Sequence, residues 1–188
     1  MKLFEVNSED LTGSLGPGLT ENKFWAFTEL SKIKTDFSVI YILGSWYGNA
    51  SLLLSMDTRF SFDKIINVDL NRSMLSIGDR MAKMLGDEKI EAMRKDVNRL
   101  DYRHVDENSL IINFSTTNIK GDDWFNNIPT GITVLLVGRD NDPGAVNQFE
   151  SLKEFLDTYP LSNILLAKRK KFQDPETEYN SFLVIGLK

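Results

Sequence analysis

Apolar and polar residues alternate along this chain in blocks that predict strands and helices in turn. Short apolar runs rich in β-branched and aromatic residues are typical of buried strands, and they occur at 38–43, 64–69, 89–95, 109–114 and 132–138. The segments between them predict helices at 22–34, 49–59, 72–85 and 147–158, with a short helix or turn at 122–128. This alternation predicts an α/β fold in which helices cover both faces of a parallel sheet.

The end of the chain departs from this alternation. Two strand-like segments, 163–172 and 179–187, are separated by the short polar stretch QDPETE. Because this stretch is too short for a crossover helix, the two strands are expected to be antiparallel. With 188 residues and no internal repeat or linker, residues 1–188 are expected to form one domain. The glycine-rich residues 1–20 are expected to form an irregular arm.

Two of the expected helices have recognisable boundaries and faces. The first has Thr20 as its expected N-cap, and its apolar spacing predicts a buried face made of Phe24, Phe27, Leu30 and Ile33. The helix at 72–85 is expected to stop at Gly86. Its predicted buried face consists of Met74, Ile77, Met81 and either Met84 or Leu85.

The stretch 38–55 contains the strongest indication of function. Its apolar strand ends at Gly44, a turn with Gly48 follows, and an apolar helix comes next. A strand, a glycine turn and a helix bring backbone N–H groups up to a nucleotide-like ligand. About 25 residues later Asp69 ends a second apolar run, where a carboxylate can accept both ribose hydroxyls. The pair predicts an adenosine-type cofactor, although glycines also serve tight packing and Asp69 can open a helix.

Composition and charge exclude several classes of function. The formal net charge is -5, and the only dense basic cluster is 168–171, so nucleic acid is not an expected partner. The absence of cysteine excludes disulfides, zinc–thiolate sites and cysteine nucleophiles. With His104 as its single histidine, the chain has no His-rich metal site, and this residue is expected on the surface. A polar N-terminus and the lack of a membrane-length apolar stretch favour a cytoplasmic protein.

The order of these elements, together with Gly44, Gly48 and Asp69, resembles the class I S-adenosylmethionine (SAM)-dependent methyltransferases. The resemblance covers about 22–188 and implies a three-layer αβα Rossmann-like sandwich. Its seven-stranded, mostly parallel sheet has the order 3-2-1-4-5-7-6, with strand 7 antiparallel. The stretch 112–142 is also similar to small methyltransferase-like proteins of bacteria and phages.

The resemblance implies SAM as the cofactor and assigns residues to its parts. The turn after the first strand would contact the methionine part, Asp69 the ribose, and Asp96 with Val97 the adenine, and Leu70 would also bind the cofactor. The turn residues are Gly44, Ser45, Trp46, Tyr47 and Gly48. Two positions depart from the family, because Ile42 replaces an acid near the amino group and Trp46 replaces the middle glycine.

Asn113 ends a buried strand at the edge where ligands bind in such sheets. It is the candidate catalytic residue, expected to align the acceptor or to hold the methionine end of SAM; the alternative is an asparagine that caps the backbone. The two prolines that DNA amino-methyltransferases carry after this position are missing. Asn113 also replaces the acid of metal-dependent relatives, so 139–142 is interpreted as a polar turn and no metal is expected.

These observations support three hypotheses. The first is a SAM-dependent methyltransferase that acts on a small molecule or a protein side chain. The second is a non-catalytic, degenerate SAM-binding or protein-interaction domain, suggested by Ile42, Trp46 and the lack of an evident general base. The third is an enzyme that uses SAM for another group transfer or breaks it down.

Overall fold

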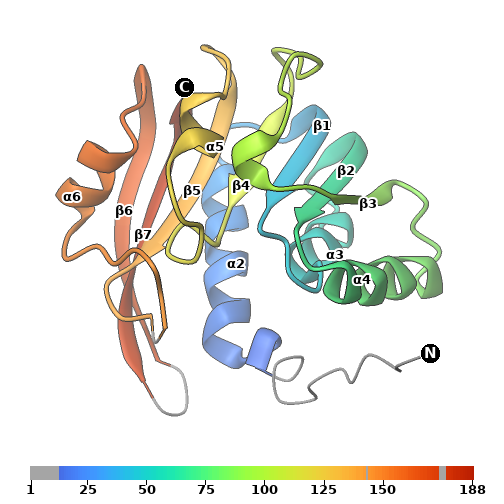
Figure 1. Ribbon diagram of the computed structural model, residues 1–188, viewed down its shortest axis with the longest axis horizontal. Coiled ribbons are helices and arrows are strands. Elements are labelled where there is room, and N and C mark those ends of the chain that lie inside the picture. Colours follow the sequence, from blue (N-terminus) through green and yellow to red (C-terminus); the bar gives the residue numbers. More distant parts are fainter. Residues whose placement is uncertain (1–12, 143, 174–176) are drawn as a thin grey trace.

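The computed structural model describes residues 13–142, 144–173 and 177–188. Its seven strands form one sheet of order β3-β2-β1-β4-β5-β7-β6 (Figure 1). The strands are β1 (Asp36–Leu43), β2 (Ser61–Asp69), β3 (Ile90–Arg94), β4 (Leu110–Asn113), β5 (Thr133–Arg139), β6 (Asn163–Gln173) and β7 (Glu178–Leu187). β1 to β5 pair in parallel, whereas β7 runs antiparallel to both β5 and β6. The predicted strand order and the antiparallel last strand are confirmed.

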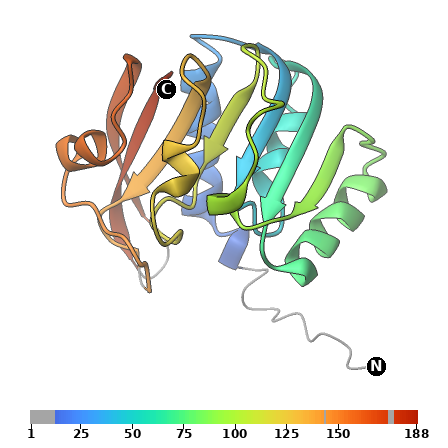
Figure 2. The ribbon, with the colours of Figure 1, turned by 45° about the horizontal axis from the view of Figure 1, so that its top comes forward.

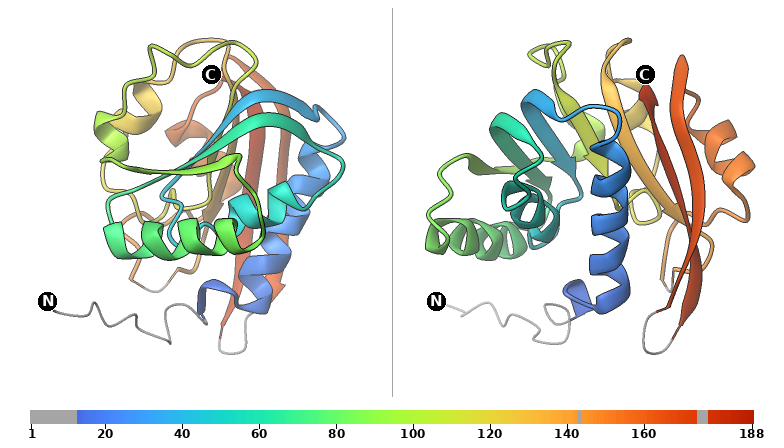
Figure 3. Two further views of the ribbon diagram at one scale, coloured as in Figure 1. Left: turned by 90° about the vertical axis from the view of Figure 1, so that its right-hand side faces the viewer. Right: turned by 180° about the vertical axis from the view of Figure 1, so that it is seen from behind.

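Helical segments cover both faces of the sheet, but unequally (Figures 2 and 3). One face, called the α2 face, is covered by α2 (Pro17–Leu30), α3 (Asn49–Ser55) and α4 (Arg72–Met84). The opposite face, called the α5 face, is covered by the short segments η1 (Val97–Arg99), α5 (Asp123–Asn126) and α6 (Leu152–Thr158).

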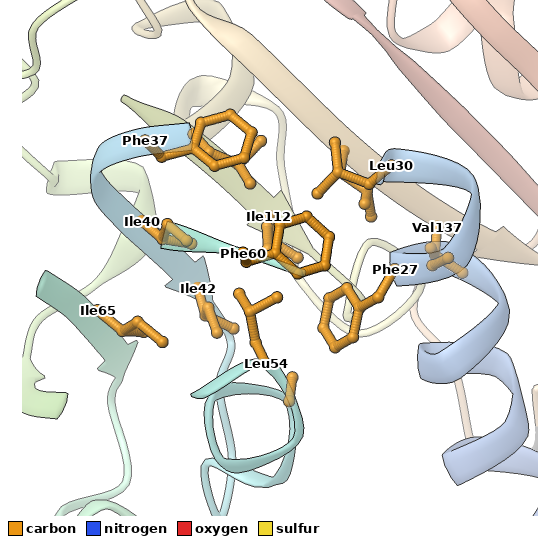
Figure 4. Close-up of a cluster of buried hydrophobic side chains, with 14 of the residues drawn as sticks. Phe27, Leu30, Phe37, Ile40, Ile42, Leu54, Phe60, Ile65, Ile112 and Val137 are labelled. Atoms are coloured by element: carbon orange, nitrogen blue, oxygen red, sulfur yellow. The ribbon is translucent and has the colours of Figure 1, made fainter. Parts of the chain in front are cut away.

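The core of the α2 face is built from aliphatic strand residues and a few rings. Figure 4 shows Phe27 of α2 and Leu54 of α3 converging on Ile42 of β1. All three are essentially excluded from solvent. Burial of each such side chain contributes about 1.5–3 kcal/mol, so these contacts anchor α2 and α3 to the sheet beside the glycine turn.

The start and the buried face of α2 differ from the prediction. The helix begins at Pro17, a residue suited to a first turn, so Thr20 is not its N-cap and the expected irregular arm is wrong for the first turn of α2. Phe24 is 48% exposed. The buried face instead includes Asn22 and Glu29, because Asn22 bonds Ser181 Oγ and Glu29 bonds Lys168. Residues 1–12 of the arm lie outside the described residues.

The buried face of α4 is also rotated from the prediction. Met84 is 87% exposed and Leu85 is 59% exposed, whereas Leu75, Gly78 and Ala82 are buried. Glycine is needed at position 78 because α4 packs against the glycine turn there: a Cβ on Gly78 would lie 2.7 Å from the Tyr47 carbonyl oxygen. The stop at Gly86 is confirmed by its φ of +71°.

The last helix is shorter than its apolar spacing predicts. α6 begins only after Ser151, whose Oγ accepts a hydrogen bond from the backbone N–H of Glu154. Phe149 therefore precedes the helix, yet it is buried against Phe155 with ring centroids 4.8 Å apart. The apolar spacing that predicted a helix from residue 147 therefore includes a loop residue, Phe149.

Candidate functional site

A cavity of about 790 Å³ lies at the carboxyl ends of the parallel strands and is called the main cavity. Its walls come from the segments that follow five strands and from the starts of two helices. The lining residues are Leu19, Gly44, Trp46, Asp69, Leu70, Met74, Lys95, Asp96, Val97, Asn98, Ser115, Asn118, Ile119, Lys120, Arg139 and Asp142. Open α/β sheets bind ligands at this edge, where the strand order reverses. Here the reversal lies between β1 and β4.

A second cavity of about 90 Å³, called the small cavity, shares six lining residues with the main one, including Trp46 and Arg139. Two buried oxygens in its lining residues, Ser45 Oγ and Asn49 Oδ1, have no hydrogen-bond partner within the described part of the chain. Buried polar atoms are normally satisfied, by water or a ligand where not by protein. Ile42, which stands where the family has an acid, lines the same cavity.

The glycine turn is locked against the loop that follows β4. Gly44 has a φ of +59°, and a Cβ there would lie 2.8 Å from the Cβ of Ser115. Ser115 Oγ donates a hydrogen bond of 2.9 Å to the Gly44 carbonyl oxygen. Glycine is therefore required at this position both by conformation and by space. Gly48, with a φ of +73°, is the N-cap of α3 and lines neither cavity.

Trp46 occupies the position of the missing middle glycine and keeps a glycine-like backbone. Its φ of +53° is positive, the only such value for a non-glycine residue in the described structure, and this conformation costs roughly 1–2 kcal/mol. The backbone N–H of Trp46 donates to Asp69 Oδ2 at 2.9 Å, which holds the turn in place. The indole packs against Tyr47 with centroids 5.3 Å apart and lines both cavities.

Asp69 joins the glycine turn to the end of β2. Its Oδ2 accepts from Trp46, and its Oδ1 accepts from the backbone N–H of Asn71 at 2.8 Å. An ionised carboxylate offers about four acceptor positions, so each oxygen can accept one further hydrogen bond. Asp69 therefore lines the main cavity with acceptor capacity for two hydroxyl groups. Leu70, beside it, is 62% exposed and lines the same cavity.

Asp96 and Val97 lie where the resemblance places the adenine, and both line the main cavity. Their neighbour Asn98 links the two loops of this wall: its Nδ2 donates to the Lys120 carbonyl oxygen at 3.0 Å, and its Oδ1 accepts from the Trp124 backbone N–H at 3.1 Å. Asn98 was not among the predicted site residues. Its place two residues after Asp96, beyond a strand end, was the available signal.

Arg139 ends β5 and lines both cavities, and sequence analysis assigned it only to a polar turn. Its Nη2 donates to Asp142 Oδ2 at 2.9 Å, and its guanidinium carbon lies 5.3 Å from the centre of the Tyr179 ring. The same Asp142 oxygen accepts from the Thr117 hydroxyl. The charge of Asp142 is thus balanced by Arg139 and one of its oxygens already accepts at least two hydrogen bonds, an arrangement that disfavours its use as a metal ligand.

Asn113 is placed differently from the other predicted site residues. It is fully buried and lines neither cavity. Its Oδ1 accepts a hydrogen bond of 2.8 Å from the backbone N–H of Ser115. This contact is of the backbone-capping kind and shapes the loop after β4, while Asn113 Nδ2 is buried and has no hydrogen-bond partner within the described residues.

Ser45 and Tyr47 line the small cavity, while Gly44 and Trp46 line both. The structure therefore brings together Gly44, Trp46, Asp69, Leu70, Asp96 and Val97 around the main cavity. It leaves Gly48 and Asn113 behind this surface. None of the helices in the described part of the chain is long and apolar enough to cross a membrane.

Comparison with known proteins supports the fold alone. No protein-family model and no curated protein matches the sequence. Solved structures do match. The N-methyltransferase NodS from Bradyrhizobium japonicum, in complex with S-adenosylhomocysteine (SAH), aligns with a TM-score of 0.68 at 11% identity, over 91% of this chain and 88% of that one.

Two further structures extend this similarity. Magnesium protoporphyrin IX methyltransferase from Synechocystis, with bound SAM, aligns with a TM-score of 0.64 at 10% identity, over 97% of this chain and 85% of that one. The YcgJ protein from Bacillus subtilis aligns with a TM-score of 0.67 at 13% identity, over 89% and 98% of the two chains. The sheet order and these alignments show the Rossmann-like fold of class I SAM-dependent methyltransferases.

Proposed function

We propose that this protein is a SAM-dependent methyltransferase that acts on a small molecule or a protein side chain. The observation that supports this best is the main cavity, which combines the glycine turn, Asp69 and Asp96 at the ends of β1, β2 and β3. Solved proteins of the same fold contain SAM or SAH, as NodS and the protoporphyrin methyltransferase do.

The donor set on the β2 and β3 side fits an adenosine cofactor. Asp69 has acceptor positions for the two ribose hydroxyls, and Asp96 lies further along the same wall for the adenine. Both are acids, which also suits the positive charge of a sulfonium compound. Bound SAM would supply an electrophilic methyl group, and the protein has to hold the acceptor in line with it.

The small cavity contains residues that could replace the acid missing at Ile42. Ser45 Oγ and Asn49 Oδ1 are buried acceptors without partners in the described structure. An ammonium group can donate to such oxygens, so these two residues would hold the amino group of the cofactor in place of a carboxylate. Lys23 lines the same cavity as a cation suited to the carboxylate end.

Asn113 would contribute to this function through the loop it supports. Its hydrogen bond to Ser115 shapes the loop that holds Gly44. We therefore interpret Asn113 as a positioning residue, and alignment of the acceptor falls to the cavity walls around Trp46, Asn118 and Arg139.

A non-catalytic SAM-binding domain is the second candidate. It is favoured by the strained Trp46, whose indole enters space that a glycine would leave open, and by Ile42. Among the described lining residues the only acids are Asp69, Asp96 and Asp142, and Asp142 is paired with Arg139.

Calorimetric titration with SAM and SAH tests the proposal. We expect binding in the micromolar range and a loss of affinity of about tenfold or more in Asp69→Asn, because hydrogen bonds to a charged group contribute about 1.5–3 kcal/mol. Asp63→Asn is the matched control, since Asp63 is an exposed acid of β2 outside both cavities. A folded wild-type protein that binds neither compound contradicts the proposal.

Product analysis then separates the candidate functions. Formation of SAH together with a methylated acceptor identifies a methyltransferase. SAM binding without any conversion, across small molecules and peptides, favours the non-catalytic domain. Conversion of SAM to other products indicates a different group transfer.

A further inference from the structure

The guanidinium of Arg139 is a preorganised cation at the β5 end of the main cavity. Its side chain is only 15% exposed. The ion pair with Asp142 holds one edge of the guanidinium, and the ring of Tyr179 lies against it at 5.3 Å. Asp142 is itself fixed by the hydroxyl of Thr117 and, at 3.3 Å, by Asn118 Nδ2.

Most of the hydrogen-bonding capacity of Arg139 is unused. A guanidinium has five N–H donors, yet within the described residues this side chain makes a single hydrogen bond, to Asp142. The planar fork of an arginine matches the paired oxygens of a carboxylate or phosphate.

Charge is distributed unevenly along the main cavity. The β2 and β3 side has two acids, Asp69 and Asp96, and one cation, Lys95. The segments after β4 and β5 add two cations, Lys120 and Arg139, against Asp142 alone, and the loop of Lys120 is hydrogen-bonded to Asn98 beside Asp96. Arg139 is therefore the cation at the β5 end of the cavity, in a chain whose net charge is -5.

Arg139 lies on the side of the cavity away from the expected adenosine. The sheet order places β4 and β5 beyond β1, opposite β2 and β3. With strands about 4.8 Å apart, β5 lies roughly 10 Å from β1. A cofactor that extends from Asp96 to the glycine turn leaves the β5 end of the main cavity for the methyl acceptor, and Arg139 also lines the small cavity that would hold the amino and carboxylate groups of the cofactor.

We propose that the acceptor is a small molecule with a carboxylate or phosphate group, which Arg139 binds at the β5 end of the main cavity. This inference rests on the proposed methyltransferase function and narrows its substrate class. It favours an anionic small molecule over a neutral one or a lysine side chain, whose ammonium Arg139 would repel.

Small probes of matched shape test this assignment. Benzoate and phenyl phosphate are titrated against benzamide by ligand-observed NMR, on protein saturated with SAH. We expect at least one anion to bind about tenfold more tightly than benzamide, as a charge-assisted hydrogen bond implies. The tighter of the two anions distinguishes a carboxylate acceptor from a phosphorylated one.

Variants connect the preference to Arg139. The preference for an anion over benzamide should vanish in Arg139→Gln and persist in part in Arg139→Lys. The double variant Arg139→Gln with Asp142→Asn avoids an unpaired buried acid, and its melting temperature shows whether the fold survives. Arg169→Gln is the matched control, since Arg169 is an exposed residue of β6 outside both cavities, and it should keep the full preference.

The remaining outcomes distinguish failure of this inference from failure of the proposed methyltransferase function. Equal binding of anions and benzamide, or a preference that survives in Arg139→Gln, overturns it even when SAH binds well. A tenfold weaker SAH affinity in Arg139→Gln with an unchanged anion preference assigns Arg139 to the cofactor instead. If wild-type protein does not bind SAH, the proposed function fails, and any anion preference then has no connection with an acceptor.

Discussion

The two faces of the sheet are covered by different means. The helices of the α2 face are 14, 7 and 13 residues long, whereas the helical segments of the α5 face have only 3, 4 and 7 residues. Helices this short are not stable alone. The α5 face compensates with large rings, which bury more apolar area per residue. They are Trp124, Phe125, Phe149, Phe155, Tyr159 and Phe182.

The difference matters for the site. On the α2 face, two helices contact the glycine turn. α4 packs against the Tyr47 carbonyl oxygen at Gly78, and α3 begins directly after Gly48. On the α5 face, the loops after β3 and β4 form one wall of the main cavity. Asn98 of the first loop is hydrogen-bonded to the backbone N–H of Trp124, which lies beyond the second loop. A ring cluster that holds very short helices therefore also positions the loops that contain Asp96 and Lys120.

The largest effect is expected from Trp124→Ala, which removes the largest side chain of the ring cluster. Trp124 is fully buried, and the centre of its ring lies 5.3 Å from the centre of the Tyr159 ring. We expect a loss of about 3–5 kcal/mol in the free energy of unfolding, measured by urea denaturation. Trp25→Ala, at a partly buried ring on the α2 face, should cost less. A loss below about 1 kcal/mol for Trp124→Ala means that the α5 face does not depend on its rings.

A smaller loss is expected from Gly138→Ala, which presses a methyl group into the same rings. The added Cβ would lie 2.6 Å from Phe155 Cε2 and 3.0 Å from Phe149 Cδ2. Overpacking of this kind costs about 1–3 kcal/mol, and thermal unfolding would show it. Gly13→Ala is the control, because no atom of the described residues lies within 4 Å of its Cβ position. Equal stability of both variants shows that the rings shift freely.

The α2 face has its own weak point at Glu29, where a buried acid joins α2 to β6. Lys168 Nζ lies 2.8 Å from Glu29 Oε2, and Lys32 Nζ lies 3.1 Å from Oε1. The hydrogen bond from Lys168 is the main cause that lowers the pKa of Glu29 below its ordinary value of 4.5, against the opposing effect of burial. Because both lysines remain partly exposed, Glu29→Gln is expected to cost only about 1 kcal/mol at pH 7.

The pH dependence of this loss follows from the lowered pKa. The contribution of the carboxylate is fully present above pH 4.5 and is lost as the pH falls through the lower pKa of the folded state. Urea denaturation of wild type and Glu29→Gln between pH 7 and pH 3 should therefore converge at the acid end. A difference that stays constant over this range shows that the ion pair does not contribute.

The smallest effect is expected from Tyr159→Phe on the α5 face. The Tyr159 hydroxyl is buried and has no hydrogen-bond partner in the described structure, and burial raises its pKa. Removing it should leave the free energy of unfolding unchanged or raise it by up to about 1 kcal/mol, measured by urea denaturation. A clear loss instead would identify an ordered water bound to this hydroxyl.

Sequence patterning predicted the fold well where burial follows simple periodicity. The five parallel strands and the antiparallel end follow from short apolar runs and one short connection. Helix faces were less predictable, because Asn22 and Glu29 are buried through partners more than a hundred residues away. The length of α6 was overestimated because the buried ring of Phe149 lies in a loop.

The site shows the same division. The place of Asp69 and of Gly44 and Trp46 at the main cavity could be predicted because it depends on local geometry at the end of a strand. Asn113 also ends a strand, yet its side-chain oxygen accepts a hydrogen bond from the backbone N–H of Ser115.

By itself the sequence determined the order of elements, the glycine turn and the acids at the strand ends, because these depend on short-range backbone preferences and on apolar periodicity. Only the tertiary structure decided that Arg139, Asn98 and Asn49 line the same two connected cavities as the glycine turn. The physical reason is that parallel strands bring their carboxyl ends to one edge of the sheet. Which side chains then meet across that edge depends on long-range hydrogen bonds and packing that no local pattern records.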